Sequence, residues 1–248
     1  MIQQPDLSIL MTVHNGIENY PTGMLELALG DHLDISAELI ITDDASTDDT
    51  VRAISELLAL PDTFDPERVI LHRHGYRQGA AAGYQSAAKL ATGRYCILQS
   101  VRSWYAEGSL REMIRVLDEQ PEIGFVYGMT AYHGKNPRVY MPPPFVRSRF
   151  WNRFDSLFGY MYRREALDHG CSYIHYLENQ ATGERLDVAD YDFVMQLIVN
   201  MGYKGLALRE LDALHYYNGG KSQMTRRVHE NQGAIDIAFK QRWGDATA

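Results

Sequence analysis

Two adjacent carboxylates, Asp43 and Asp44, directly follow the short apolar run Leu39-Ile40-Ile41. Such a run fills a strand that is covered on both faces, and Ser46 or Thr47 then supplies an N-cap for the next helix. Both acids are therefore expected at the carboxyl end of a parallel strand, where open α/β sheets bind their ligands. The alternative is a capped turn whose acids are only solvated.

A second acidic group, Asp190-Tyr191-Asp192, begins a helical pattern that Gly202 ends. Acids in the first turn of a helix interact favourably with the helix dipole. Asp190 and Asp192 are therefore expected to stabilise the start of a helix, which fixes the direction of their side chains. For Asp190 the alternative is a plain N-cap, which it would be if the helix began one residue later.

The first hundred residues predict four strands that alternate with helices. This alternation, with helical crossovers, predicts a mostly parallel sheet covered on both faces. An Ala-rich helix with Gly83 inside it is expected to pack closely against a neighbour. The strands are expected at residues 7–13, 39–42, 69–71 and 95–98, and the helices at 24–29, 48–60 and 79–90.

The second half of the chain is less regular. Residues 131–154 are rich in Tyr, Pro and Arg and have no clear period, which predicts a long surface loop that acts as a lid or an oligomer interface. Residues 171–187 form a second polar insertion. The other elements are expected as helices at 109–120, 164–169, 190–201 and 226–242, and as strands at 124–130, 159–163 and 205–208.

Composition limits the class of protein. A chain of 248 residues with 45% apolar content fits one domain, with halves at 1–105 and 106–220 and a C-terminal helix at 221–248. The net charge of −8 argues against nucleic acid as a partner. Two cysteines, no signal-peptide pattern and no long apolar run indicate a soluble, cytoplasmic protein without a transmembrane segment.

Six motifs in order resemble the inverting family 2 glycosyltransferases of the GT-A fold, an α/β fold. The resemblance covers about residues 5–220 and implies a nucleotide-sugar donor over the first half of the sheet and an acceptor over the second. It also implies a role in polysaccharide or glycoconjugate biosynthesis. The motifs are Val13-His14-Asn15, the stretch 40–48, Gly79 with the Ala-rich helix, the stretch 91–95, the stretch 159–167, and Asp190-Tyr191-Asp192-Phe193 before Gly202-Tyr203-Lys204.

The resemblance assigns roles to residues in both halves. The acid pair Asp43 and Asp44 is expected to bind a pyrimidine and its ribose, which favours a UDP-sugar donor. For Asn15 the alternative is that it is only a turn residue. The expected donor-binding residues are Thr12, Val13, Asn15, Asp43, Asp44, Arg77, Gln99, Ser100 and Arg102. The expected binding residues for a glycan or other hydroxyl acceptor are Trp104, Tyr160, Asp192 and His215.

The resemblance also places the general base at Asp190, with Ala189 where the family often has another acid. In an inverting displacement an acceptor hydroxyl attacks the anomeric carbon while the nucleoside diphosphate leaves. The hydroxyl must lose a proton to a nearby base, and the growing charge on the diphosphate must be stabilised. Asp190 can meet the first need.

The Asp-x-Asp that holds a divalent cation in this family is missing. After Leu98 the chain reads Gln99-Ser100-Val101-Arg102-Ser103, without a carboxylate. Amide and hydroxyl groups alone make a poor site for Mg²⁺ or Mn²⁺. Arg77 and Arg102 are therefore expected to replace the cation by charge-assisted bonds, and the alternative is surface arginines beside a decayed site.

Two other functions stay open. One is a catalytically silent relative that binds a nucleotide or a partner protein. The other is a nucleotidyltransferase on a similar sheet, which is disfavoured because no Gly-rich, Lys-containing phosphate loop follows the first strand. A homo-oligomer would follow if the loop 131–154 were an interface.

Overall fold

The computed structural model describes residues 4–19, 35–60, 69–147, 159–173, 177–179, 181–183, 185–186, 188–218 and 232–244. Within these residues, nine strands form one sheet in the order β3-β2-β1-β4-β8-β6-β11-β5, and β7 pairs with β6. β9 and β10 form a separate two-stranded sheet. The helix expected at 24–29, the end of the loop expected at 131–154 and the start of the helix expected at 226 lie outside the described residues.

The described elements are bounded as follows. The strands are β1 (Leu7–Val13), β2 (Ala37–Asp43), β3 (Val69–Arg73), β4 (Tyr95–Ser100), β5 (Ser103–Tyr105), β6 (Ile123–Gly134), β7 (Arg138–Tyr140), β8 (Met161–Arg163), β9 (Leu177–Glu178), β10 (Arg185–Leu186) and β11 (Lys204–Asn218). The helices are α1 (Gly16–Asn19), α3 (Thr50–Leu58), α4 (Ala80–Leu90), α5 (Ser109–Glu119), α6 (Glu165–Asp168), α7 (Ala189–Val199) and α9 (Gln232–Trp243).

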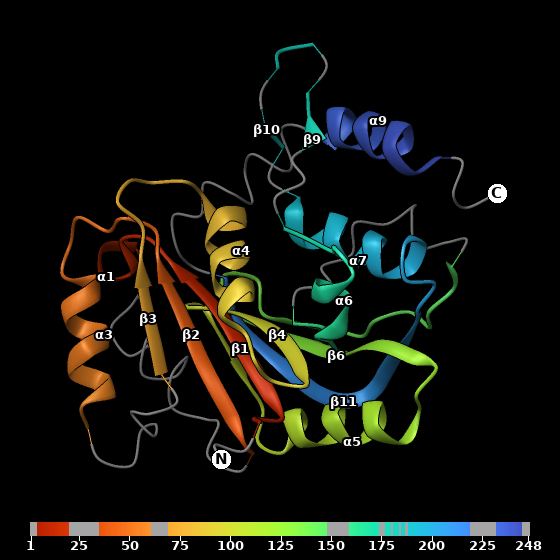
Figure 1. Ribbon diagram of the computed structural model, residues 1–248, viewed down its shortest axis with the longest axis horizontal. Coiled ribbons are helices and arrows are strands. Elements are labelled where there is room, and N and C mark those ends of the chain that lie inside the picture. The colour runs from red at the N-terminus through yellow and green to blue at the C-terminus, as the bar shows by residue number, and fades with distance from the viewer. Residues whose placement is uncertain are drawn as a thin grey trace.

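Helices cover both faces of the sheet, as the alternation predicts (Figure 1). β1, β2, β3 and β4 are parallel neighbours, and β6 and β11 form a second parallel pair. One core lies between the sheet and α4, α6 and α7 and extends to α9, which packs on α7, whereas the other core lies between the sheet and α3 and α5. The buried area of these two cores stabilises the layers because apolar side chains leave water on folding. The expected α/β architecture is confirmed.

Gly83 explains how closely α4 packs on the sheet. A Cβ atom at this position would lie 2.1 Å from Oγ1 of Thr12 and 2.8 Å from its Cβ. No side chain fits in that space, so the helix can approach β1 only with glycine here. The close packing expected from the sequence is confirmed. It places the helix directly against Thr12, near the carboxyl end of β1.

The prediction of a loop at 131–154 is wrong for the first ten of these residues. β6 continues to Gly134, and β7 returns along it with Thr130 opposite Tyr140 and Tyr132 opposite Arg138. Gly134 and Asn136 take left-handed backbone angles at the hairpin, with φ of 88° and 57°. Cross-strand contacts, such as Arg138 over the ring of Tyr132, stabilise a pairing that apolar alternation does not reveal.

The last strand is also longer than expected. β11 spans Lys204–Asn218, whereas apolar residues predicted a strand only at 205–208. The register with β6 shifts between Leu208 and Asp212, so the strand carries an irregularity there. The exposed Arg209 and Glu210 fall inside that shift, which breaks the apolar pattern without ending the strand.

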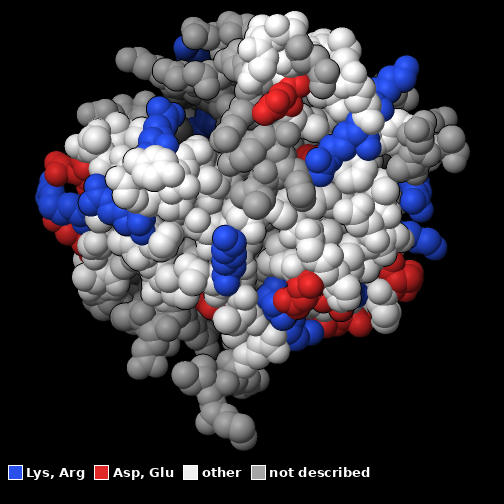
Figure 2. Space-filling model, turned by 45° about the horizontal axis from the view of Figure 1, so that its top comes forward, with Lys and Arg blue, Asp and Glu red and all other residues white. Residues whose placement is uncertain are grey.

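Charged side chains are interspersed over the face shown in Figure 2, with acidic and basic groups lying near each other. On that face the described residues form no continuous basic stripe of the kind that follows a phosphate backbone. None of the described helices has the length and apolar character that crossing a bilayer requires.

Candidate functional site

Three neighbouring strands bring the expected donor residues to one edge of the sheet. Thr12 on β1 lies opposite Thr42 on β2 and Ser100 on β4, and Val13 lies opposite Asp43 in the next row. The Oγ1 atoms of Thr12 and Thr42 are buried without hydrogen-bond partners among the described residues. The Thr12 side chain faces Gly83 of α4. The carboxyl edge therefore combines polar side chains with close helix packing.

Asp43 is fully buried at the end of β2. Its carboxylate accepts a hydrogen bond from the backbone N–H of Ser46 at 3.2 Å, and Nε of Arg73 lies 3.1 Å from Oδ2. Arg73 also donates to the carbonyl oxygen of Ser46. Asp43 thus closes the turn after β2 and ties it to the end of β3.

Asp44 holds a second loop to the same edge. Its two carboxylate oxygens accept hydrogen bonds from the backbone N–H groups of Gln78 and Gly79, both at 2.8 Å. Nδ1 of His74 lies 2.8 Å from Oδ1. Only 3% of Asp44 is exposed, so this carboxylate positions the segment that leads into α4. Its role toward a donor stays a prediction.

Hydrogen bonds control the charge of Asp44. Burial raises the pKa of Asp44, but the hydrogen bonds from His74, Gln78 and Gly79 outweigh that effect and leave the pKa below its usual value. Nε2 of His74 lies 2.9 Å from Oγ of Ser86 on α4. His74 was not predicted as a site residue, because a single histidine after a short strand forms no recognisable pattern.

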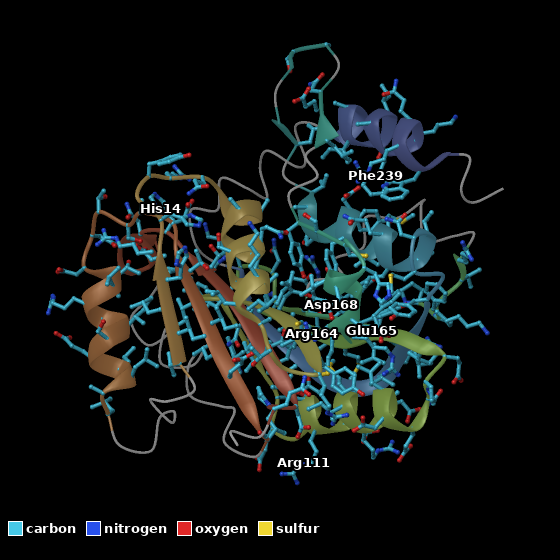
Figure 3. The ribbon with its side chains drawn as sticks, in the orientation of Figure 1. His14, Arg111, Arg164, Glu165, Asp168 and Phe239 are labelled. Atoms are coloured by element: carbon cyan, nitrogen blue, oxygen red, sulfur yellow. The ribbon has the colours of Figure 1, made fainter. Side chains whose placement is uncertain are left out.

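Asn15 joins the end of β1 to the turn after β2. Its backbone N–H donates to Oγ of Ser46 at 2.9 Å, and its Oδ1 accepts the N–H of Thr47 at 2.9 Å. Its φ of 49° is left-handed, a conformation that asparagine tolerates. These contacts fit a turn residue, and the role of Asn15 toward a donor stays a prediction. His14 beside it, labelled in Figure 3, has Nδ1 2.8 Å from the carbonyl oxygen of Asp44.

The segment 99–103 is a turn closed by its own hydrogen bonds. The buried Gln99 donates its amide to the carbonyl oxygen of Ser103 at 3.2 Å. The N–H of Ser100 donates to Oγ of Ser103, and the N–H of Arg102 donates to Oγ of Ser100, both at 3.0 Å. The side chains of Gln99 and Ser100 therefore hold the turn together.

The two arginines expected at the diphosphate lie in different surroundings. The guanidinium of Arg102 lies over the ring of Tyr216, 4.9 Å from its centroid. Arg77 is exposed on the segment that Asp44 holds. Arg102 follows β4 and Arg77 follows β3, and these strands are separated in the sheet by β2 and β1.

Asp190 is the second residue of α7 and is partly buried. The helix begins at Ala189 and Val188 is its N-cap, so the N-cap alternative for Asp190 is wrong. The hydroxyl of Tyr160 donates to the carbonyl oxygen of Asp190 at 3.1 Å. Tyr160 itself is fully buried, so it supports the backbone of Asp190, in contrast to the direct acceptor contact expected of it.

Asp192 was expected to bind an acceptor, and its placement corrects that expectation. The side chain is fully buried and faces α9. Its Oδ1 accepts the indole N–H of Trp243 and lies beside Nε of Arg242, both at 2.9 Å, while Oδ2 accepts the amide of Gln196 at 3.0 Å. Asp192 is an anchor for the C-terminal helix, which the sequence pattern of α7 alone does not show.

Trp104 and His215 lie together on neighbouring strands, with the ring of His133 as a third member. Trp104 stacks on His133 and His215 at centroid distances of 5.2 and 5.3 Å. His133 was expected on the loop 131–154 as part of a lid over an anionic or glycan-like acceptor site, but it lies on the strand β6. The structure therefore brings two of the four expected acceptor residues into one cluster.

Comparison with known proteins identifies the chain. The sequence model of glycosyl transferase family 2 matches residues 8–179. This chain belongs to glycosyl transferase family 2. The match covers β2, β4, all of β1 except Leu7 and the segment 99–103, so it includes the part of the fold where the expected donor residues lie.

Solved structures of similar shape support the GT-A fold of this family 2 member. TarS of S. aureus, residues 1–349 in complex with UDP-GlcNAc, has a TM-score of 0.68 and 14% identity, with 89% of this chain and 60% of that chain covered. The mannosyltransferase PcManGT of Pyrobaculum calidifontis, in complex with GDP-Man and Mn²⁺, has a TM-score of 0.65 and 18% identity, covering 97% and 65%. GalNAc-T7 with UDP, GalNAc and Mn²⁺ has a TM-score of 0.58 and 14% identity, covering 92% and 48%.

The residues of this family 2 chain do not fit a divalent cation at the segment 99–103. The segment offers no carboxylate, and the amide of Gln99 and the hydroxyls of Ser100 and Ser103 are already hydrogen-bonded within the turn. Across the described residues, no group of three or more His, Cys, Asp or Glu side chains could hold an ion. Hard cations prefer charged oxygen ligands, which this turn lacks.

Proposed function

We propose that this chain transfers a sugar from a nucleotide-diphosphate donor, with a UDP-sugar favoured, to an acceptor hydroxyl with inversion at the anomeric carbon. The family match over residues 8–179 carries the proposal. The ligands named with the similar structures, UDP-GlcNAc and GDP-Man, support a nucleotide-sugar donor. The chain spans about 60% of the TarS fragment, so its activity is inferred for the portion that matches.

In the proposed reaction the acceptor oxygen forms a bond to the anomeric carbon as the bond from that carbon to the diphosphate breaks. The electron pair of the broken bond leaves with the nucleoside diphosphate, and the hydroxyl proton passes to the carboxylate of Asp190. A general base of this kind accelerates transfer because the hydroxyl becomes a stronger nucleophile as its proton leaves. The position of Asp190 near the start of α7, with Tyr160 bonded to its backbone, fixes where that base is held.

In this proposal, arginine stabilises the negative charge on the departing diphosphate. A guanidinium can bind two phosphate oxygens through charge-assisted hydrogen bonds, so it can stabilise the leaving group directly. Arg102 is the better placed of the two, because its turn directly follows β4 beside Ser100. Arg77 lies on the loop that Asp44 holds, and it is the second candidate.

The test is a transfer assay with UDP-GlcNAc, UDP-glucose and GDP-mannose, each supplied with a mixture of mono- and oligosaccharide acceptors. Released nucleoside diphosphate and glycosylated product are measured with EDTA or with MnCl₂. Product formation with an inverted anomeric configuration supports the proposal, and Asp190→Asn is the matched negative control. Binding of nucleotide without product for any donor would instead favour a catalytically silent relative, which the carboxylate-free turn at 99–103 also favours.

A further inference from the structure

Three aromatic rings from three neighbouring strands form one flat cluster. Trp104 comes from β5, His133 from β6 and His215 from β11. The two imidazole rings are nearly parallel, with an interplanar angle of 12° and centroids 5.1 Å apart. Trp104 lies at 26° to both of them. We call Trp104, His133, His215 and the adjoining Asp212 the imidazole cluster.

A chain of hydrogen bonds gives the imidazole cluster a direction. Nε2 of His215 lies 3.1 Å from Oδ2 of Asp212, and Nδ1 of His215 lies 2.9 Å from Nε2 of His133. A carboxylate only accepts, so Nε2 of His215 carries the hydrogen and, in the neutral ring, Nδ1 accepts. His133 must then donate from Nε2. Its Nδ1 atom is left as a lone-pair acceptor.

Two polar atoms of the cluster have no bonding partner within the described part of the chain. One is Nδ1 of His133, an acceptor, and the other is the indole N–H of Trp104, a donor. Solvent reaches the cluster, since 21% of the His215 side chain and 53% of the Asp212 side chain are exposed and Trp104 and His133 are only partly buried. A hydroxyl group both donates and accepts, so it matches this pair of atoms.

The imidazole cluster lies on the face of the sheet that α7 covers. Side chains alternate along β6, so His133 shares a face with Phe125 and Tyr127, whose rings belong to the core beneath α7. His215 follows Leu214, which packs in the opposite core. The cluster and Asp190 are therefore on the same side of the sheet.

The chemistry favours a sugar over an ion. Aromatic faces contact the C–H surface of a sugar ring, and the two free polar atoms suit its hydroxyls. A metal ion is disfavoured because the two facing imidazole nitrogens hydrogen-bond to each other, and among the described residues Asp212 alone brings a carboxylate to them. A phosphate is disfavoured because, in the hydrogen-bond pattern that Asp212 sets, Nδ1 of His133 presents a lone pair.

We infer that the imidazole cluster is a subsite for a sugar acceptor, in which Trp104 contacts the ring and Nδ1 of His133 accepts a hydrogen bond from a hydroxyl. Asp212 acts through His215 as a positioning residue. The role of the bound sugar as an acceptor rests on the proposed function. The binding of a sugar at this cluster does not depend on transfer.

The first experiment measures the ring tautomers in the free protein by ¹⁵N NMR. Both His133 and His215 should carry hydrogen on Nε2, and Asp212→Asn should change the His215 signals more than those of His169, an exposed histidine on another element. Hydrogen on Nδ1 of His133 would overturn the inference, whether or not the protein transfers sugars.

The second experiment titrates N-acetylglucosamine, galactose and mannose while following the imidazole and indole signals. At least one sugar should shift them in the wild type, and the shifts should vanish in His133→Phe, which keeps a flat ring but loses the nitrogen acceptor. Tyr132→Phe is the matched control, because Tyr132 is the neighbouring residue on the opposite face and contacts Tyr216. Shifts that persist in His133→Phe, or no shift with any of the three sugars, would overturn the subsite.

Transfer assays then separate this inference from the proposed function. If transfer occurs, His133→Phe should raise the acceptor KM by about 2- to 13-fold, the range for one neutral hydrogen bond, with donor KM unchanged. An unchanged acceptor KM overturns the subsite while the proposed function stands. Sugar binding at the cluster without any transfer supports the subsite and counts against the proposed function.

Discussion

Trp243, near the end of α9, donates its indole N–H to Oδ1 of Asp192 at 2.9 Å, and this bond joins the C-terminal helix to the helix that carries Asp190. Phe239 on the same face of α9 points toward α7 in Figure 3 and packs on Tyr191, with ring centroids 4.9 Å apart. The two residues that follow Asp190 are therefore both held by α9. The C-terminal helix therefore holds the first turn of α7, which carries Asp190, the general base of the proposed reaction.

Trp243→Phe should reduce the free energy of unfolding by about 1–3 kcal/mol, because it leaves a buried carboxylate short of a donor while keeping most of the ring. Urea unfolding checks this value. In a double-mutant cycle with Asp192→Asn, the two changes should be strongly non-additive. Additive losses would mean that the indole N–H contributes nothing to Asp192, and Tyr76→Phe at an exposed position is the control.

Gly83→Ala should destabilise the protein even though alanine favours a helix by about 1 kcal/mol. The new Cβ would lie 2.1 Å from Oγ1 of Thr12, and overpacking of this kind costs typically about 1–3 kcal/mol. Gly233→Ala in α9 is the matched control, because nothing lies within 4 Å of its added Cβ. Thermal unfolding should show a lower Tm for the first variant and an equal or higher Tm for the second.

The sequence predicted those parts of the fold that local patterns encode. The apolar runs of β1, β2 and β4 and the glycine inside α4 have one physical interpretation, and the structure confirms it. The length of β11 was missed because its pairing partner β6 lies far away in the sequence. The hairpin β6–β7 is local, but it was missed because its strands lack an apolar alternation.

The sequence predicted which residues lie at the strand ends of the site, but not the partners that these and other site residues bind. The register places Thr12, Asp43 and Ser100 together, as strand ends in a parallel sheet require. No pattern in the sequence shows that Asp192 bonds Trp243, since these residues are 51 positions apart. The partners of Asp44 were equally hidden, because Gln78 and Gly79 bind it through backbone N–H groups that every residue has.

Asp44→Asn should lower the free energy of unfolding near neutral pH. It should also make that free energy depend less on pH in the acidic range. The folded-state pKa of Asp44 is depressed, so its contribution is complete above the unfolded pKa of about 3.9 and is lost as pH falls through the lower folded pKa. The stability gap between wild type and variant, measured by urea unfolding, should therefore begin to narrow as the pH falls below about 5 and close as the pH passes the folded-state pKa. A constant gap would show that the charge of Asp44 does not matter, and Glu56→Gln on the exposed face of α3 is the control.

Arg102→Gln should weaken UDP binding by roughly tenfold or more, since a hydrogen bond to a charged group contributes about 1.5–3 kcal/mol. Arg138→Gln is the matched control, because Arg138 also lies over a tyrosine ring but on the β7 hairpin. Calorimetry with UDP should give similar affinities in EDTA and in MnCl₂. An affinity that collapses in EDTA and ignores Arg102→Gln would replace the arginine hypothesis with a metal site built from other residues.

Asp190→Asn should lower turnover by on the order of 100- to 10,000-fold, the usual effect of removing a general base. Nucleotide affinity should stay near that of the wild type, because the carboxylate acts on the acceptor and not on the donor. Asp168→Asn, at the exposed end of α6 (Figure 3), controls for the loss of an acid elsewhere. Asp192→Asn separates chemistry from support: it should lower stability through α9, and any loss of turnover should be smaller. Full activity in Asp190→Asn would assign the base to another residue, whereas equal losses of turnover at 190 and 192 would mean that α7 must be held in place but that Asp190 carries no proton.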